Sequence, residues 1–104
     1  MSKNPKVINA DPNFNLAKWA SEETFLHLSP PDFPNDWIAC EKWLIPAVLE
    51  KGYIIYVFIN KRGYMATIVP EMPVGGYRHI SSKGETMAEA VTKACQELIK
   101  EKNE

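Results

Sequence analysis

The sequence predicts an α+β fold of the three-layer type: a three-stranded antiparallel meander with a helix on each face, in the order (α)-α-β-β-β-α. Three observations predict this α/β/α sandwich. Apolar residues recur at helical spacing on both sides of a central segment. The central segment instead has the residue types and turn signals of strands. Its first strand is apolar on both faces, so each face of the sheet needs a cover.

The chain has 104 residues, with 45% apolar and 24% charged residues. That length gives one domain and excludes a two-domain enzyme, and the composition excludes wholesale disorder. We expect a flexible N-terminal arm at residues 1–11, one domain at 12–102 and a C-terminal tail at 103–104. The net charge of -1 disfavours a surface for binding polyanions.

A short first helix is predicted over residues 12–20. Asp11 can serve as its N-cap, and Pro12 suits the first helical position. Leu16 and Trp19 share one side of it. Residues 28–35 contain three prolines, which exclude regular structure there, so we expect an extended loop.

A second helix is predicted between a cap at Asn35 or Asp36 and a stop at Gly52. Pro46 interrupts it and should kink it near Lys42, because proline lacks the backbone N–H. The apolar stripe consists of Trp37, Cys40, Leu44 and Val48, widened by Ile45 and Leu49.

The central segment predicts three strands. Residues 53–59 are apolar or aromatic without a break, and residues 64–69 return. Residues 60–63 form a hairpin connection in which Gly63 can take a positive φ. A loop at 70–76 leads to a more polar edge strand at 77–81.

The first strand requires burial on both sides. Successive side chains of a strand point to opposite faces, and both sets are apolar here. Leaving Ile54, Tyr56 and Phe58 in water would forfeit several kcal/mol, because burying one such side chain contributes about 1.5–3 kcal/mol. We therefore expect one long helix on each face; a dimer covering one face with its partner would meet the same requirement.

The last helix has the clearest start signal. Residues 86–89 read Thr-Met-Ala-Glu, a capping box in which the Thr86 side chain accepts from the third residue and Glu89 reaches back. Its apolar stripe consists of Met87, Ala90, Val91, Ala94, Cys95, Leu98 and Ile99.

One resemblance covers about residues 12–102. The loop Pro30-Pro31-Asp32-Phe33-Pro34-Asn35-Asp36, the helix start at 37–43, three strands and an Ala-rich last helix opened by Thr86 resemble the phage ABA-sandwich domain family. The resemblance implies a layered α/β/α protein of a phage or prophage with no assigned biochemical role. The motif carries no catalytic residue.

A second resemblance covers only the C-terminal half. Residues 63–73 followed by Gly-Glu-Thr-Met-Ala-Glu-Ala at 84–90 are similar to the HicB-type antitoxin pattern. Val74 stands where that family has glycine, and some fifty residues precede the first strand. This resemblance implies an antitoxin or RNA-associated module with one free sheet face and a basic partner toxin.

Residue types that carry chemistry are scattered. Cys40 and Cys95 lie on apolar stripes and are predicted to be reduced, buried thiols. His27 and His79 are isolated from each other and from any Cys-x-x-Cys motif. We therefore predict no metal, no cofactor and no enzymatic activity. A deep pocket lined by His79 and a carboxylate would revive a small enzyme.

Two sets of side chains are candidates for binding. Trp19, Phe33 and Trp43 are candidate protein-binding residues, although each can instead complete the core. A candidate basic rim at one end of the sheet consists of Lys61, Arg62, Arg78 and Lys83. The order helix, three strands, helix is also that of double-stranded-RNA-binding domains, which place both helices on one face. In those domains the last helix starts with several lysines, whereas here that start holds one.

The sequence thus predicts a small non-enzymatic phage or prophage accessory protein that acts by binding a protein or by self-association. The alternative is a HicB-like antitoxin or RNA-associated binding module, with nucleic acid the less favoured partner. The sequence has no run of about 20 apolar residues and no secretory h-region, so we expect no membrane segment and a location in the cytoplasm of a bacterial host.

Overall fold

The computed structural model describes residues 12–72 and 79–102. The predicted arm at 1–11 with its cap Asp11, the tail at 103–104 and the predicted strand start at Tyr77 lie outside the described residues. The helical elements are α2 (Pro12–Ser21), α3 (Trp37–Ala39), a π-helical turn (Cys40–Leu44), α4 (Ile45–Glu50) and α5 (Met87–Lys102), with short 3-10 turns at Thr24–Leu26 and Phe33–Asn35. The strands are β1 (Tyr53–Asn60), β2 (Gly63–Pro70) and β3 (Ile80–Gly84).

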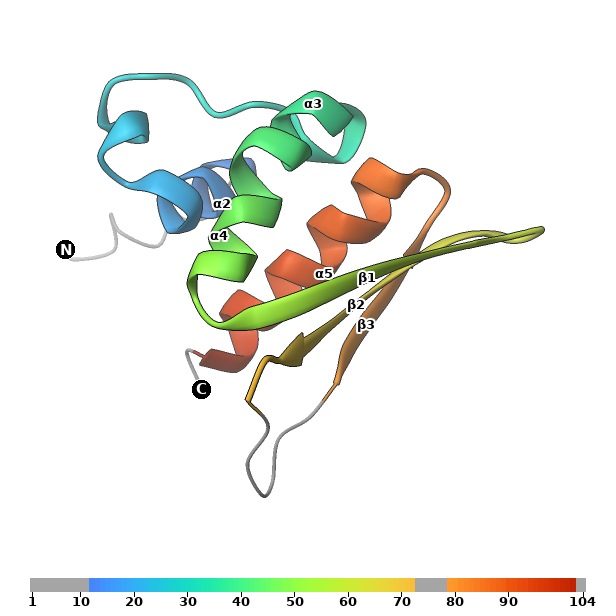
Figure 1. Cartoon of the computed structure of the whole chain (residues 1–104). Coiled ribbons are helices and arrows are strands. Elements are labelled where there is room, and N and C mark those ends of the chain that lie inside the picture. The colour runs from blue at the N-terminus through green and yellow to red at the C-terminus, as the bar shows by residue number, and fades with distance from the viewer. Residues whose placement is uncertain (1–11, 73–78, 103–104) are drawn as a thin grey trace, which may run out of the picture.

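The predicted class and element order are confirmed. Helices come first, the three strands form an antiparallel meander in the order β1-β2-β3, and α5 then packs on the sheet (Figure 1). Asn60 pairs with Gly63 across a two-residue connection, and Gly63 takes the predicted positive φ of 127°. Among the described residues the third strand runs from Ile80 to Gly84, so it ends three residues beyond the predicted end at residue 81.

The prediction of a helix on each face is wrong. All described helices lie on one side of the sheet in Figure 1, where α5 covers β2 and β3 and α4 lies nearest β1. The side chains facing this helical layer enter the core, including fully buried Ala66 and Ile68. Tyr56 and Phe58 on the other face remain 48% and 46% exposed. The fold therefore has two layers.

Small side chains explain how one face accommodates both helical segments. Ala66 lies at the centre of β2, and α5 contributes Ala90 and Ala94 to the same core. Small residues let α5 approach the sheet closely. The segment Cys40–Leu44 packs on α5 and covers the side of the core away from the sheet. The fully buried Phe33, Leu16 and Leu44 fill the remaining space.

The region of Pro46 is a wide turn of helix. The N–H of Ile45 donates to the Cys40 carbonyl, five residues earlier, and the segment Cys40–Leu44 is π-helical. In a regular α-helix the proline ring would crowd the carbonyl of Lys42, four residues before it. The wider turn is one of the known ways in which a helix admits such an interruption, so the disturbance lies where the sequence predicts it.

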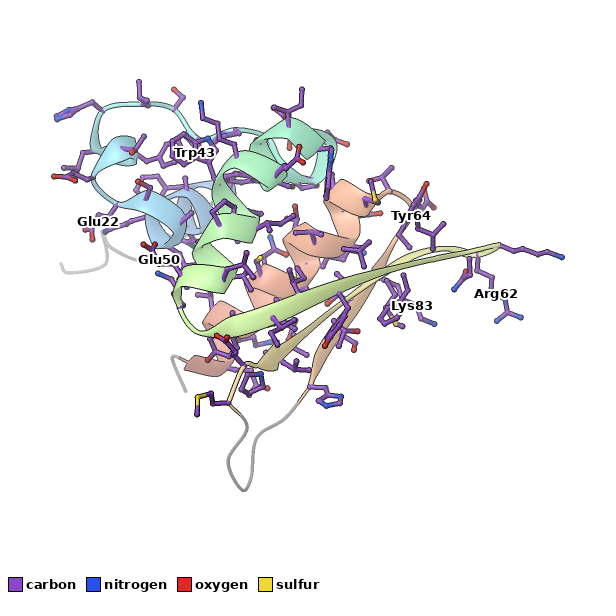
Figure 2. The ribbon with its side chains drawn as sticks, in the orientation of Figure 1. Glu22, Trp43, Glu50, Arg62, Tyr64 and Lys83 are labelled. Carbon is purple, nitrogen blue, oxygen red and sulfur yellow. The ribbon has the colours of Figure 1, made fainter. Side chains whose placement is uncertain are left out.

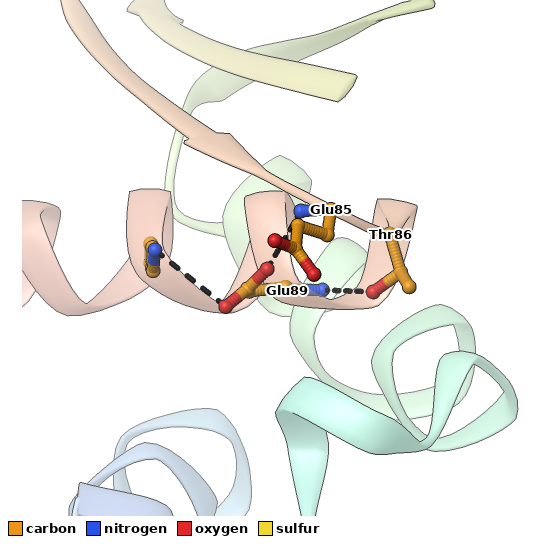
Figure 3. Close-up of polar contacts among 4 residues, drawn as sticks. Glu85, Thr86 and Glu89 are labelled. Atoms are coloured by element: carbon orange, nitrogen blue, oxygen red, sulfur yellow. Dashed lines mark hydrogen bonds and ion pairs between the residues drawn. The ribbon is translucent and has the colours of Figure 1, made fainter. Parts of the chain in front are cut away.

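The predicted caps of the second and the last helix are present. Asp36 Oδ1 accepts a hydrogen bond from the Ala39 N–H at 3.1 Å. Thr86 Oγ1 accepts from the Glu89 N–H at 3.1 Å, and the Glu89 carboxylate accepts from the Glu85 N–H at 2.6 Å (Figure 3). Lys93 lies 3.6 Å from the same carboxylate. These contacts fix the start of α5 directly after β3.

Candidate functional site

The face of the sheet opposite the helices is the candidate site, here called the open face. The register places its side chains in rows across the strands: Phe58 beside Met65 and Lys83, Tyr56 beside Thr67 and Ser81, and Ile54 beside Val69. A strand points alternate side chains to the same face, so these residues share a surface. No helix among the described residues covers it.

An aromatic pair occupies the β1 side of the open face. The rings of Tyr56 and Phe58 are stacked, with centroids 6.3 Å apart and an interplanar angle of 26°. Both residues lie on β1, and both expose nearly half of their surface. Exposed aromatic residues clustered in this way are typical of interaction surfaces, because they bury a large area at a small cost in side-chain entropy.

The polar part of the open face lies on β3. Thr67 and Ser81 share a hydroxyl–hydroxyl hydrogen bond of 2.9 Å between β2 and β3. Lys83 is exposed one row further toward the hairpin. The open face thus grades from an uncharged, aromatic strand to a polar strand with one cation.

Three residues of the candidate basic rim lie at one end of the sheet. Lys61 and Arg62 form the β1–β2 connection, and Lys83 lies at the same end of the sheet, because it pairs with Met65 near the start of β2. Arg78 lies outside the described residues. Figure 2 places Arg62 and Lys83 toward this end and Glu22 and Glu50 toward the opposite end of the molecule.

The other predicted binding residues pack in or against the core. Phe33 is fully buried, and its N–H donates to Asn13 Oδ1 at 3.3 Å. Trp43 is half-buried and meets Phe25 edge to face, with centroids 5.1 Å apart. Trp19 is also half-buried. None of the three belongs to the open face.

Two of the tryptophans make cation–π contacts with lysine side chains. Lys42 Nζ lies 5.1 Å from the ring centroid of Trp43, and Lys51 Nζ lies 5.2 Å from that of Trp19. These cation–π contacts hold the lysine side chains against the helical layer, away from the open face.

The cysteines are free and buried, as predicted. Burial raises the pKa of Cys95 to about 12, with a further contribution from Cys40. Burial also raises the pKa of Cys40, although its hydrogen bond with Thr92 opposes the shift. The Cys40 thiol contacts the Phe33 carbonyl at 3.2 Å. Both thiols are thus protonated at neutral pH, which is the unreactive form.

One surface hollow brings a histidine and carboxylates together. A hollow of about 290 Å³ is lined by His79, Glu97 and Glu101, among others, and opens broadly to solvent. It is not the deep pocket that would favour a small enzyme, because the hollow is shallow and open to solvent. Within residues 12–72 and 79–102, no three His, Cys, Asp or Glu side chains converge as metal ligands.

No helix in the described part of the chain is both long and apolar enough to span a membrane.

Sequence reasoning identified the residues of the aromatic pair but assigned them to the interior. The signal for an open face was present in the neighbouring strands, because Thr67, Ser81 and Lys83 share its side of the sheet. A polar set on one face of two strands is typical of a face that meets solvent. No family model, curated protein or solved structure matches the chain.

Proposed function

We propose that the protein is a small non-enzymatic accessory protein whose open face binds an apolar surface of another protein. The observation that carries this proposal is the exposed aromatic pair of Tyr56 and Phe58 on the outer strand β1, on a face that no described helix covers. Lys83 at the edge supplies the polar rim that such interfaces usually have. The buried, protonated thiols support a binding role over a nucleophilic one.

The phage or prophage setting rests on the ABA-sandwich resemblance of the loop and helix-start residues, and so does a location in the cytoplasm of a bacterial host. The two-layer fold does not add to this support, because it lacks the second helical layer that the resemblance implies. A gene position among phage early genes would support that setting. A gene position among housekeeping operons with no phage gene nearby would contradict it.

A paired binding experiment tests the open face. The double variant Tyr56→Ser with Phe58→Ser removes the aromatic pair, while Ile38→Ser removes an isoleucine that is 74% exposed on α3, outside the sheet. We expect a partner, identified by its retention on the immobilised wild-type chain, to bind wild type and the Ile38 variant with equal Kd. The Kd of the double variant should rise at least tenfold, which corresponds to a loss of about 1.4 kcal/mol in binding free energy.

Equal binding by the double variant, with its fold intact by circular dichroism, would contradict the proposal. Turnover of a substrate by the purified chain at an ordinary enzymatic rate would contradict the non-enzymatic role.

A HicB-like antitoxin or RNA-associated module is the second candidate function. The observation that favours it is the free sheet face with both helical segments on the other side, which that resemblance and the order of double-stranded-RNA-binding domains imply. The net charge of -1 and the single lysine before Thr86 favour a basic protein toxin over RNA as its ligand.

Co-expression separates the two candidates. An adjacent gene for a small basic toxin, whose growth inhibition this chain relieves, would establish the antitoxin. Tight, salt-sensitive binding of a duplex RNA would instead establish the RNA-associated module.

A further inference from the structure

The outer edge of β1 has features that its counterpart on β3 lacks. In the order β1-β2-β3, no strand of residues 12–72 and 79–102 pairs with the outer edge of β1 or of β3. β3 has five residues, including Lys83 and two serines, whereas β1 has eight residues and no charge or proline. Charge and brevity normally protect an edge from pairing with another chain. β1 has neither protection.

The hydrogen-bonding pattern shows which residues of β1 direct their backbone N–H and C=O groups away from β2. The Glu71 N–H donates to the Gly52 carbonyl at 2.9 Å, so position 52 bonds toward β2. Antiparallel ladders alternate, so the even positions of β1 bond toward β2 and the odd positions direct N–H and C=O away from it. Pro70, which has no N–H, fits this phase because it pairs with Tyr53. The outward set is Tyr53, Ile55, Val57 and Ile59.

Charge is distributed along β1 in a self-complementary way. Its start lies beside the exposed Glu50 and Glu71, and its end leads into the exposed Lys61 and Arg62. Lys51, the one cation at the start, is held over the Trp19 ring. Two copies paired antiparallel would bring the basic end of each β1 to the acidic end of the other.

We propose that two copies of this chain dimerise by antiparallel pairing of their β1 edges into one six-stranded sheet. The two β1 strands overlap along their whole length when a two-fold axis passes between Tyr56 and Tyr56 of the second copy. In this alignment the outward backbone groups of the odd-numbered residues face one another. Ile59 then lies opposite Tyr53, and Val57 lies opposite Ile55. The connection that holds Arg62 in each copy approaches the α4–β1 junction of the other copy, where Glu50 ends α4. About eight new main-chain hydrogen bonds form in this register.

The dimer also accounts for exposed apolar side chains. Ile59 is 68% exposed and points to the helical side, where the pairing places it beside Tyr53 of the second copy. Both helical layers stay on one side of the joined sheet, because the axis is perpendicular to it. The two aromatic pairs then lie side by side on a continuous open face. This proposal does not depend on the proposed function.

The first test is the molar mass in solution, measured by light scattering over a concentration series. We expect wild type to approach twice its 11.8 kDa. Ile59→Lys adds a charge to the outward edge at an exposed side chain and should shift the mass to that of one chain. The matched control Ile38→Lys, at 74% exposure on α3, should remain dimeric.

Charge reversal tests the register. Arg62→Glu and Glu50→Arg should each weaken dimerisation at low salt, and the double variant should restore it. The two residues sit at opposite ends of a strand of eight residues, roughly 27 Å long, so they cannot pair within one chain. Failure of the double variant to restore the dimer would overturn the register.

A cysteine placed on the axis gives a second readout. Tyr56→Cys should form an intermolecular disulfide on mild oxidation, because opposed residues outside the hydrogen-bonded pairs have Cα atoms about 4.5 Å apart. Thr67→Cys, on the same face but one strand away, should not, and the buried native thiols should not interfere. A wild-type chain that is monomeric at every concentration would overturn the proposal, and so would a dimer that survives Ile59→Lys.

Discussion

Gly84→Ala should destabilise the protein through a clash at the start of α5. Gly84 ends β3 on the side that faces the helix, and α5 begins at Met87. A Cβ at this position would lie 2.6 Å from the Ala90 nitrogen and 2.9 Å and 3.0 Å from the Cβ and carbonyl carbon of Glu89. Two of these three atoms belong to the backbone, so a simple change of rotamer cannot relieve the contact.

The expected loss is about 1–2 kcal/mol. Forcing one extra carbon into a packed site typically costs about 1–3 kcal/mol. Replacing glycine also restricts the unfolded chain, which returns about 0.4–1 kcal/mol. In a domain of this size such a net loss lowers Tm by roughly 5–15 °C.

Urea denaturation followed by circular dichroism measures the change. Ser82→Ala is the matched control, since Ser82 lies on the same side of β3 and already has a Cβ. We expect the control to stay within about 0.5 kcal/mol of wild type. A Gly84→Ala protein as stable as wild type would refute the close approach of β3 to the first turn of α5.

Two further predictions concern the start of α5 and the thiols. Thr86→Ala should cost about 1 kcal/mol in urea denaturation, whereas Thr86→Ser should keep most of the stability, because the hydroxyl caps the Glu89 N–H. The hydrogen bond from the Glu85 N–H lowers the pKa of Glu89 in the folded protein. The stabilisation that the ionised Glu89 carboxylate provides is therefore complete above the ordinary carboxyl pKa and is lost as pH falls through the lowered pKa. Glu89→Gln should flatten this decrease of stability at acid pH. An unchanged limb would contradict the bond. Cys40 and Cys95 should react with a thiol-specific chromogenic disulfide only after denaturant is added, and stoichiometric labelling of the native chain would contradict their burial.

Features with a local cause could be predicted from the sequence. The capping box at Thr86, the Asp36 cap and the positive φ of Gly63 each depend on residues within a few positions of one another. The hairpin register follows from the two-residue connection between Asn60 and Gly63. For these elements, local chemistry leaves few alternatives.

The allocation of helices to faces could not be predicted in the same way. A strand that is apolar on both sides shows that each face avoids water, but it does not show which element covers which face. Ala66, Ala90 and Ala94 make one face suitable for close helix packing, and that advantage arises only when segments distant in sequence meet. The sequence therefore predicts that a helix buries Tyr56 and Phe58, whereas in the structure that helix packs on the other face of the sheet.

The candidate site was missed for the same reason. Residue type and position in a loop or beside a stripe favour Trp19, Phe33 and Trp43 as binding residues, whereas the structure packs them in or against the core. Sequence reasoning did place Lys61, Arg62 and Lys83 together, because strand order alone determines which end of the sheet they share.

The wide turn before Pro46 has a consequence for chain length. Relative to an α-helix, the segment Cys40–Leu44 accommodates one additional residue per turn. The five residues of this segment turn the chain about as far as four residues of an α-helix would, so deleting one residue would leave Val48 and β1 in nearly the same orientation. The ring of Pro46 would then crowd the carbonyl four residues before it, which the wide turn now avoids. A one-residue deletion here should therefore be tolerated only when Pro46 is replaced as well.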